Sequence, residues 1–131
     1  MCCLFRWDIS IPGHLRWNGH AASSRYANRE VNVISRQWRG LARPGQDLNY
    51  VAHLREETFP ALSRLSGFIS ASILSRRLDR GTEFLVVTRW RSLDDIASFS
   101  GTDLEAAVVP AKVVAMMVEY DDRACHFEVI E

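Results

Sequence analysis

The chain has 131 residues, of which 47% are hydrophobic and 24% charged, and its formal net charge is zero. This length and composition suit one globular domain with a hydrophobic core. The net charge of zero does not indicate binding to nucleic acid or to an anionic membrane. The chain also contains no run of about 18 apolar residues, which is the length needed to span a bilayer. We therefore expect a cytoplasmic protein with neither nucleic-acid nor membrane partners.

Residues 1–30 show no sustained hydrophobic period and lack the apolar centre of a secretory signal. We expect them to be a disordered extension, or the result of a start codon assigned too far upstream, outside a folded domain of residues 31–131. The chain contains no CxxC pair and no HExxH helix, so the sequence indicates neither a metal site nor a dedicated cofactor.

The first half of the domain shows one helical pattern between strand patterns. Alternating apolar and polar residues predict a strand over residues 31–39. Hydrophobic residues at helical spacing predict a helix over residues 47–63, with Pro60 kinking it on the solvent side. Two further alternating runs, 68–77 and 82–91, flank a short turn at residues 79–81, which predicts an antiparallel hairpin.

The second half begins with a helix signal. Ser92 followed by Asp95 approximates a capping box, so a helix is predicted from Leu93 to the Ser100-Gly101 stop. A short helix over residues 103–109 and a last strand over residues 123–130 complete the pattern. The order βαββαβ predicts an α+β fold of the ferredoxin-like type, with a four-stranded antiparallel sheet and both helices on one face.

The strand predicted over residues 82–91 is apolar on both faces. Phe84 and Val86 lie on one face, whereas Leu85 and Val87 lie on the other. Because the helices can cover one face alone, a second copy of the chain is the simplest cover for the other. We therefore expect a homodimer, and an open sheet with a modest apolar patch is the alternative.

Short strings occur along the domain in a characteristic order and spacing. They are Trp38-Arg39-Gly40, Pro44-Gly45, Phe59-Pro60-Ala61-Leu62, Gly67-Phe68, the run from Glu83 to Leu93, and His126-Phe127-Glu128-Val129. Together they resemble the antibiotic biosynthesis monooxygenase family over about residues 31–131. The tryptophan at the end of the third strand, followed by a serine-capped helix, is the most specific part. The resemblance implies a dimeric α+β barrel with a pocket between helices and sheet.

The resemblance also implies a function. Members include cofactor-independent oxygenases of polycyclic phenols, so we expect a monooxygenase that acts on an aromatic or polyketide-type small molecule. Such chemistry needs a dry aromatic pocket and a group that removes a phenolic proton. Trp38, Tyr50 and Phe99 are the candidate substrate-binding residues. Trp90 and His126 are the candidate catalytic residues, with His126 as the proton acceptor.

The family pattern is incomplete in this sequence. Quinone-forming relatives carry Asn, Tyr and Arg where Val86, Ile96 and Pro110 stand here, and haem-degrading relatives carry a histidine ligand near Val109. Haem degradation is therefore disfavoured. A non-catalytic dimeric domain, which binds a small ligand or serves dimerisation alone, is the alternative function.

Two charged pairs are secondary candidates. His53 and Glu57 are four residues apart on the predicted helix, where such pairs usually support the solvent-facing surface. Arg76 and Arg77 end the second strand and could hold an anionic phenolate, although strand-end arginines are more often solvated.

Overall fold

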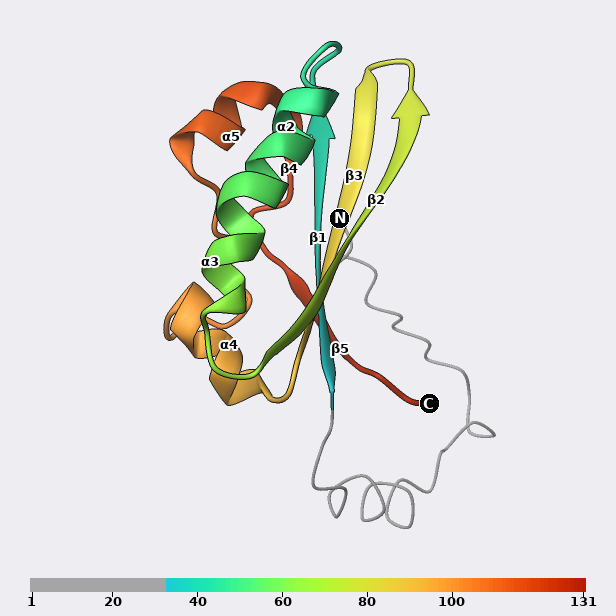
Figure 1. Cartoon of the computed structure of the whole chain (residues 1–131). Coiled ribbons are helices and arrows are strands. Elements are labelled where there is room, and N and C mark those ends of the chain that lie inside the picture. Colours follow the sequence, from blue (N-terminus) through green and yellow to red (C-terminus); the bar gives the residue numbers. More distant parts are fainter. Residues whose placement is uncertain (1–32) are drawn as a thin grey trace, which may run out of the picture.

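The computed structural model describes residues 33–131, so the expectation for residues 1–30 lies outside the described part. One antiparallel sheet carries the helices on one of its faces (Figure 1). The elements are β1 (Ile34–Ala42), α2 (Asp47–His53), η2 (Leu54–Thr58), α3 (Phe59–Ser63), β2 (Phe68–Leu78), β3 (Gly81–Trp90), α4 (Leu93–Ser100), α5 (Ala111–Met116), β4 (Met117–Tyr120) and β5 (Cys125–Glu128). No helix within residues 33–131 is long and apolar enough to cross a membrane.

The strand order confirms the predicted α+β ferredoxin-like fold. The strands follow the order β2-β3-β1, and the position beyond β1 is shared by two strands. β4 pairs with β1 at Gly40–Ala42, whereas β5 pairs with it at Ile34–Gln37. The sheet thus has four positions filled by five strands, because the last strand is interrupted. The sequence predicted β5 but missed β4.

The predicted helix over residues 47–63 is present as α2, η2 and α3, which follow one another without a break. The middle segment, η2, is π-helical, and the N–H of Phe59 donates to the carbonyl of Leu54, five residues back. Pro60 has no N–H to donate into an α-helical turn. The wider π turn carries the chain into this proline.

The region of residues 101–110, which we call the loop 101–110, corrects one expectation. It is not the helix predicted over residues 103–109. The carbonyl groups of Leu104 and Ala106 accept hydrogen bonds from the buried side chain of Arg36, and Ala106 forms a β-bridge with Arg123. Carbonyls used in this way cannot serve a helix. The helix forms one turn later, as α5, which begins directly after Pro110.

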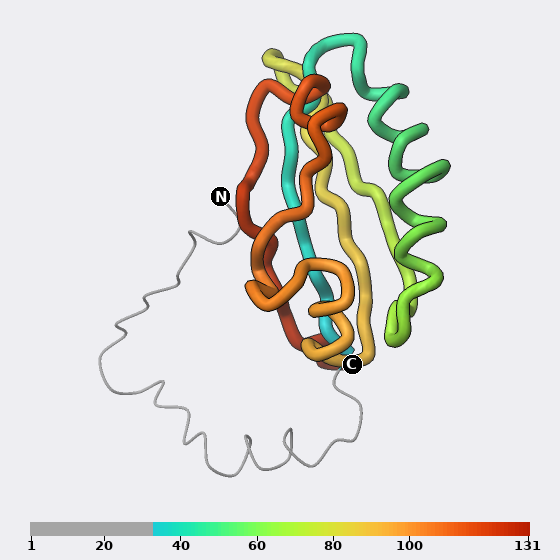
Figure 2. The backbone as a smooth tube through the Cα atoms, turned by 90° about the vertical axis from the view of Figure 1, so that its left-hand side faces the viewer, coloured from blue at the N-terminus to red at the C-terminus, as the bar shows by residue number. Residues whose placement is uncertain are grey.

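The helices and the loop together cover one face of the sheet. In Figure 2 the helix over residues 47–63 (green) and the segment with α4 and the loop 101–110 (orange) lie side by side over this face. Two clusters of buried residues fill the space beneath them. One contains Tyr50, Leu54 and Phe84, and the other contains Trp90 and Ile96. The candidate site lies between these layers.

Candidate functional site

A cavity of about 270 Å³ lies between the sheet, the helix over residues 47–63 and the segment of residues 107–113. Its volume is near the lower end of the range for small-molecule pockets, roughly 300–1,000 Å³. Most lining side chains are apolar, including Leu54, Leu62, Val86, Val109 and Val113. The cavity is therefore a mainly apolar space of a size that suits a small molecule.

Three aromatic residues predicted to bind substrate, Trp38, Tyr50 and Phe99, all line this cavity. The ring centroids of Trp38 and Tyr50 are 6.2 Å apart, and the indole Nε1 of Trp38 donates to the carbonyl of Asp121 at 2.7 Å. Phe99 comes from α4, on a different side of the cavity. The structure thus brings together aromatic walls from β1, α2 and α4.

Gly40 explains how the indole of Trp38 fits. Both residues lie on the helix-covered face of β1, two positions apart. A Cβ atom at Gly40 would be 2.6 Å from Cη2 of Trp38 and 3.0 Å from Sδ of Met117. Only glycine lets the indole lie flat here. The Trp38-Arg39-Gly40 string is therefore a packing unit of the pocket wall.

The phenol of Tyr50 is a buried donor. Its side chain is 2% exposed, and burial raises the pKa of Tyr50 well above its usual value. The hydroxyl therefore stays protonated near neutral pH. No residue of the described part accepts a hydrogen bond from it, so this hydroxyl can donate to a ligand in the cavity.

His53 forms a hydrogen-bonded set with Glu57 and Thr58, and all three line the cavity. Nδ1 of His53 is 2.7 Å from Oε2 of Glu57, and Nε2 is 3.1 Å from Oγ1 of Thr58. With the proton on Nδ1, the imidazole donates to the carboxylate and accepts from the hydroxyl at Nε2. A histidine held in this way is arranged as a general base.

The position of His53 contradicts the expectation that it faces solvent, because its side chain is buried. The π turn of η2 is the reason. In a π turn, residues four and five positions ahead stand above the same side chain, so Glu57 and Thr58 both meet His53. Lys112 at α5 covers the outer side and forms an ion pair with Glu57. The hydrogen bond from Lys112, then that from His53, lowers the pKa of Glu57.

The two predicted catalytic residues lie outside the lining of the cavity. Trp90 is fully buried, its Nε1 donates to Oγ1 of Thr88, and its ring stacks at 6.3 Å behind that of Phe99. His126 on β5 is paired with Arg36 of β1, and its Nε2 is 2.7 Å from Nη1 of Arg36. Arg36 lines the cavity and His126 does not.

Sequence reasoning missed Arg36, although a signal was present. Arg36 stands between Ile34 and Trp38 on the face of β1 that the helices cover, and it is 5% exposed. A charged residue in an inward-facing register is unusual. In contrast, the arginines first considered for binding an anion, Arg76 and Arg77, are exposed on β2, and Arg76 pairs with Glu83.

The sequence and fold of the chain are similar to those of known proteins. The sequence profile described as antibiotic biosynthesis monooxygenase matches residues 34–111, more than half of the chain. No curated protein sequence matches the chain significantly. Among residues 33–131, no group of three or more His, Cys, Asp or Glu side chains is arranged to hold a metal ion.

Solved structures share the fold. Two candidate antibiotic biosynthesis monooxygenases, from Bacillus cereus and Bordetella bronchiseptica, each align with a TM-score of 0.55 over 76% of this chain, at 17% and 16% identity, and cover 94% and 99% of their own chains. A monooxygenase of Streptomyces coelicolor in complex with the ligand nanaomycin D aligns with a TM-score of 0.50 and 14% identity, over 80% of this chain and 93% of its own. At these identities the likeness is one of fold.

Proposed function

The chain belongs to the antibiotic biosynthesis monooxygenase family, and on this premise we propose that it oxygenates an aromatic, polyketide-type molecule in the cytoplasm without a dedicated cofactor. The observation that carries the proposal is the hydrogen-bonded pair of the buried His53 and the half-exposed Glu57, which line an aromatic-walled cavity. A base in a dry pocket is what activation of a phenol requires. A structural relative solved in complex with the ligand nanaomycin D supports a small-molecule ligand for this fold.

The proposed reaction needs no external reductant, because the substrate supplies the electrons. Nε2 of His53 takes the proton of a phenol, and the ring anion transfers one electron to O₂. The resulting radical pair combines into a peroxide anion with a new C–O bond, and the imidazolium of His53 returns its proton to give the hydroperoxide. Loss of water, in which the O–O bond breaks and the carbon bearing the oxygen loses its hydrogen, gives the quinone. One oxygen atom enters the product and the other leaves as water.

Each polar residue has a proposed part in this reaction. Glu57 holds the Nδ1 proton and stabilises the imidazolium that forms on His53. The hydroxyl of Thr58, which now donates to Nε2, is replaced by the phenol when substrate binds. Tyr50 donates to a substrate oxygen. Trp90 supports the ring of Phe99 from behind, in contrast to the direct catalytic part first expected of it.

Oxygen uptake tests the proposal. The full chain is assayed with 1,5-dihydroxynaphthalene and with an anthrone, each with and without prior treatment with a chelator. We expect consumption of one O₂ per quinone formed, unchanged by the chelator and strongly reduced in His53→Gln. A rate equal to that of buffer for every substrate of the panel would contradict a monooxygenase of this type.

A non-catalytic ligand-binding domain is the second candidate, and two lining residues favour it. Val86 and Pro110 stand where quinone-forming relatives carry polar groups, and both line the cavity as apolar residues. Such a domain would bind the same aromatic compounds without consuming oxygen. Tight binding with no uptake would therefore support this function over the first.

We further propose that a second copy of the chain covers the face of the sheet that carries no helix. On this face Leu74 is 52% exposed and Phe127 is 49% exposed, next to the half-buried Leu85 and Val87. Apolar side chains gathered on a sheet face are typical of an interface. Light scattering should give twice the chain mass, and Leu74→Glu should lower it. A monomer at micromolar concentration would contradict the dimer.

A further inference from the structure

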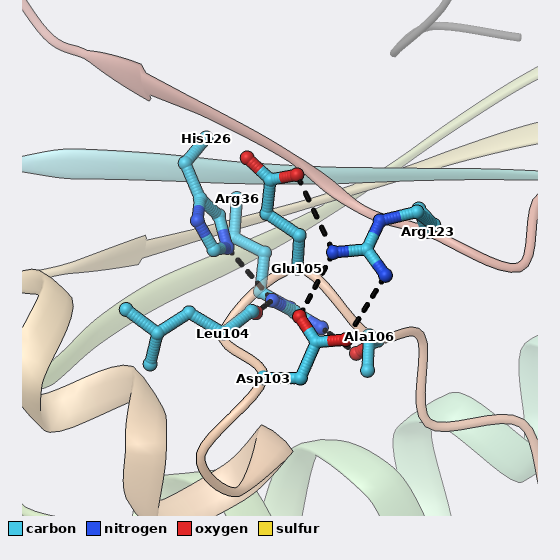
Figure 3. Close-up of polar contacts among 7 residues, drawn as sticks. All are labelled: Arg36, Asp103, Leu104, Glu105, Ala106, Arg123 and His126. Atoms are coloured by element: carbon cyan, nitrogen blue, oxygen red, sulfur yellow. Dashed lines mark hydrogen bonds and ion pairs between the residues drawn. The ribbon is translucent and has the colours of Figure 1, made fainter.

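The side chain of Arg36 carries a charge into the interior of the domain. The residue is 5% exposed and lines the cavity. Figure 3 shows its guanidinium between β1, His126 and the loop 101–110. Placing a cation in such a position is costly unless an opposite charge compensates it.

The contacts of Arg36 within residues 33–131 contain no carboxylate. Nη1 donates to the carbonyl of Leu104 and to Nε2 of His126, and Nη2 donates to the carbonyl of Ala106 at 2.7 Å. The ring of Phe99 lies 5.6 Å from Cζ. These partners are neutral, so they orient the cation without neutralising it.

The neighbouring carboxylates are engaged elsewhere. Asp103 and Glu105 both form ion pairs with Arg123 (Figure 3). Burial lowers the pKa of Arg36 to about 10, and the more distant charge of Glu105 offsets this in part. The guanidinium nevertheless stays charged at neutral pH, and three of its five N–H groups account for the three contacts.

We propose that Arg36 binds an anionic group of the ligand, so that the pocket selects aromatic carboxylic acids over neutral aromatic molecules. This inference deepens the proposed function and rests on the same pocket. The two N–H groups of Arg36 without a partner in the described part suit a carboxylate, and the ring of the ligand lies against Phe99 and Trp38. The phenol of the same ligand reaches His53, which lines the cavity from the helix.

His126 is a positioning residue in this arrangement. Its Nε2 accepts from Arg36, which requires a neutral imidazole with its proton on Nδ1. His126 and the two loop carbonyls therefore fix the orientation of the guanidinium. The groups that face His126 are Arg36 on β1 and Glu105 in the loop 101–110.

Calorimetric titration tests the inference without any turnover. The full chain is titrated with 2-naphthoate and with the neutral 2-naphthamide, which has a similar shape. We expect the carboxylate to bind the wild type at least about tenfold more tightly, as a charge-assisted pair provides. In Arg36→Met the ratio should fall to about one, and Arg36→Lys should retain part of it.

Arg77→Met is the matched control, because it removes an arginine that is exposed outside the cavity; it should keep the wild-type ratio. The wild-type ratio alone decides the matter if Arg36→Met does not fold. Equal binding of amide and acid, an unchanged ratio in Arg36→Met, or no binding of either compound at millimolar concentration would each overturn the inference.

The two proposals fail in different ways. If naphthoate binds as expected while no substrate consumes oxygen, the monooxygenase proposal fails and the anion site stands. If neutral phenols consume oxygen while naphthamide binds as tightly as naphthoate, the anion site fails and the monooxygenase proposal stands.

Discussion

Two regions beside the pocket each hold a histidine next to a charged group, and the charges are opposite. On the helix, His53 contacts the carboxylate of Glu57, whereas on β5, His126 contacts the guanidinium of Arg36. A carboxylate stabilises the imidazolium that a base forms, and a guanidinium opposes it. The charge beside each histidine therefore distinguishes the proposed base, His53, from the neutral positioning residue, His126.

The local backbone produces this difference. The π turn of η2 brings two side chains of one helix onto His53. On the sheet, strand pairing places His126 directly opposite Arg36. The helical pair therefore lines the cavity, and the sheet pair presents Arg36 to it with His126 behind.

The largest expected effect separates the two histidines in steady-state oxygen uptake. His53→Gln removes the proposed base and should lower kcat by about 10²-fold or more. His126→Gln leaves the proposed base in place, so kcat should change by less than about threefold, but it alters how the guanidinium of Arg36 is held, so KM should rise. The measurement is uptake against substrate concentration for both variants.

The opposite result would contradict the roles proposed for the two histidines. A loss of kcat in His126→Gln with normal turnover in His53→Gln would assign the proton to the histidine of β5. Circular dichroism of both variants serves as the check that the fold is retained.

A smaller effect is expected from the carboxylate beside His53. Glu57→Gln removes the charge that stabilises the imidazolium, and kcat should fall about tenfold. Glu56→Gln is the matched control, because Glu56 is an exposed neighbour on the same turn and does not line the cavity. Equal rates in the two variants would show that the carboxylate does not act on His53.

The pH dependence of stability tests whether His126 is neutral in the folded chain. Burial, and then the charge of Arg36, lowers the pKa of His126 from its usual value of 6.5. Below about pH 6.5 the unfolded chain binds a proton that the folded chain does not yet bind. The free energy of unfolding is therefore fully maintained above this pH and decreases as the pH falls below it.

His126→Gln lacks this titrating group, so its stability should depend less on pH below about pH 6.5. Urea unfolding at several pH values measures the difference, and the lowered carboxylate pKa values of Glu57, Glu83 and Asp103 affect both proteins alike. A steeper dependence in the variant would contradict the neutral state of His126.

The smallest effect is expected where each region meets solvent. Lys112 pairs with Glu57, and Arg123 pairs with Asp103, and all four side chains are more than 40% exposed. Exposed ion pairs contribute little to stability, because solvent screens both charges. Lys112→Met and Arg123→Met should each leave the midpoint of urea unfolding almost unchanged. A marked fall of the midpoint would show that an outer pair holds its region together.

Much of the fold could be predicted because its signals are local. The serine cap of α4 is confirmed, since Oγ of Ser92 accepts from the N–H of Asp95 at 3.2 Å. Alternation located three of the strands, and helical spacing located residues 47–63. Trp38, Tyr50 and Phe99, which were expected from the family resemblance, line the cavity.

The remaining features depend on contacts between distant parts of the chain. The helix predicted over residues 103–109 is absent because Arg36, far away in sequence, takes the carbonyls of that segment. The inward position of His53 depends on a π turn and on α5 above it, which no pattern of period 3.6 reports. The sequence shows that Arg36 places a charge at an inward-facing position of a strand. It does not show which residues Arg36 contacts.

Anaerobic difference spectroscopy tests most directly whether His53 is the base. An anthrone is mixed with the protein in the absence of O₂, so that deprotonation is observed without oxygenation. The wild type and His126→Gln should both produce the red-shifted absorption band of the anion, and His53→Gln should not. An anion band of equal size in His53→Gln would contradict the assignment of His53 as the base.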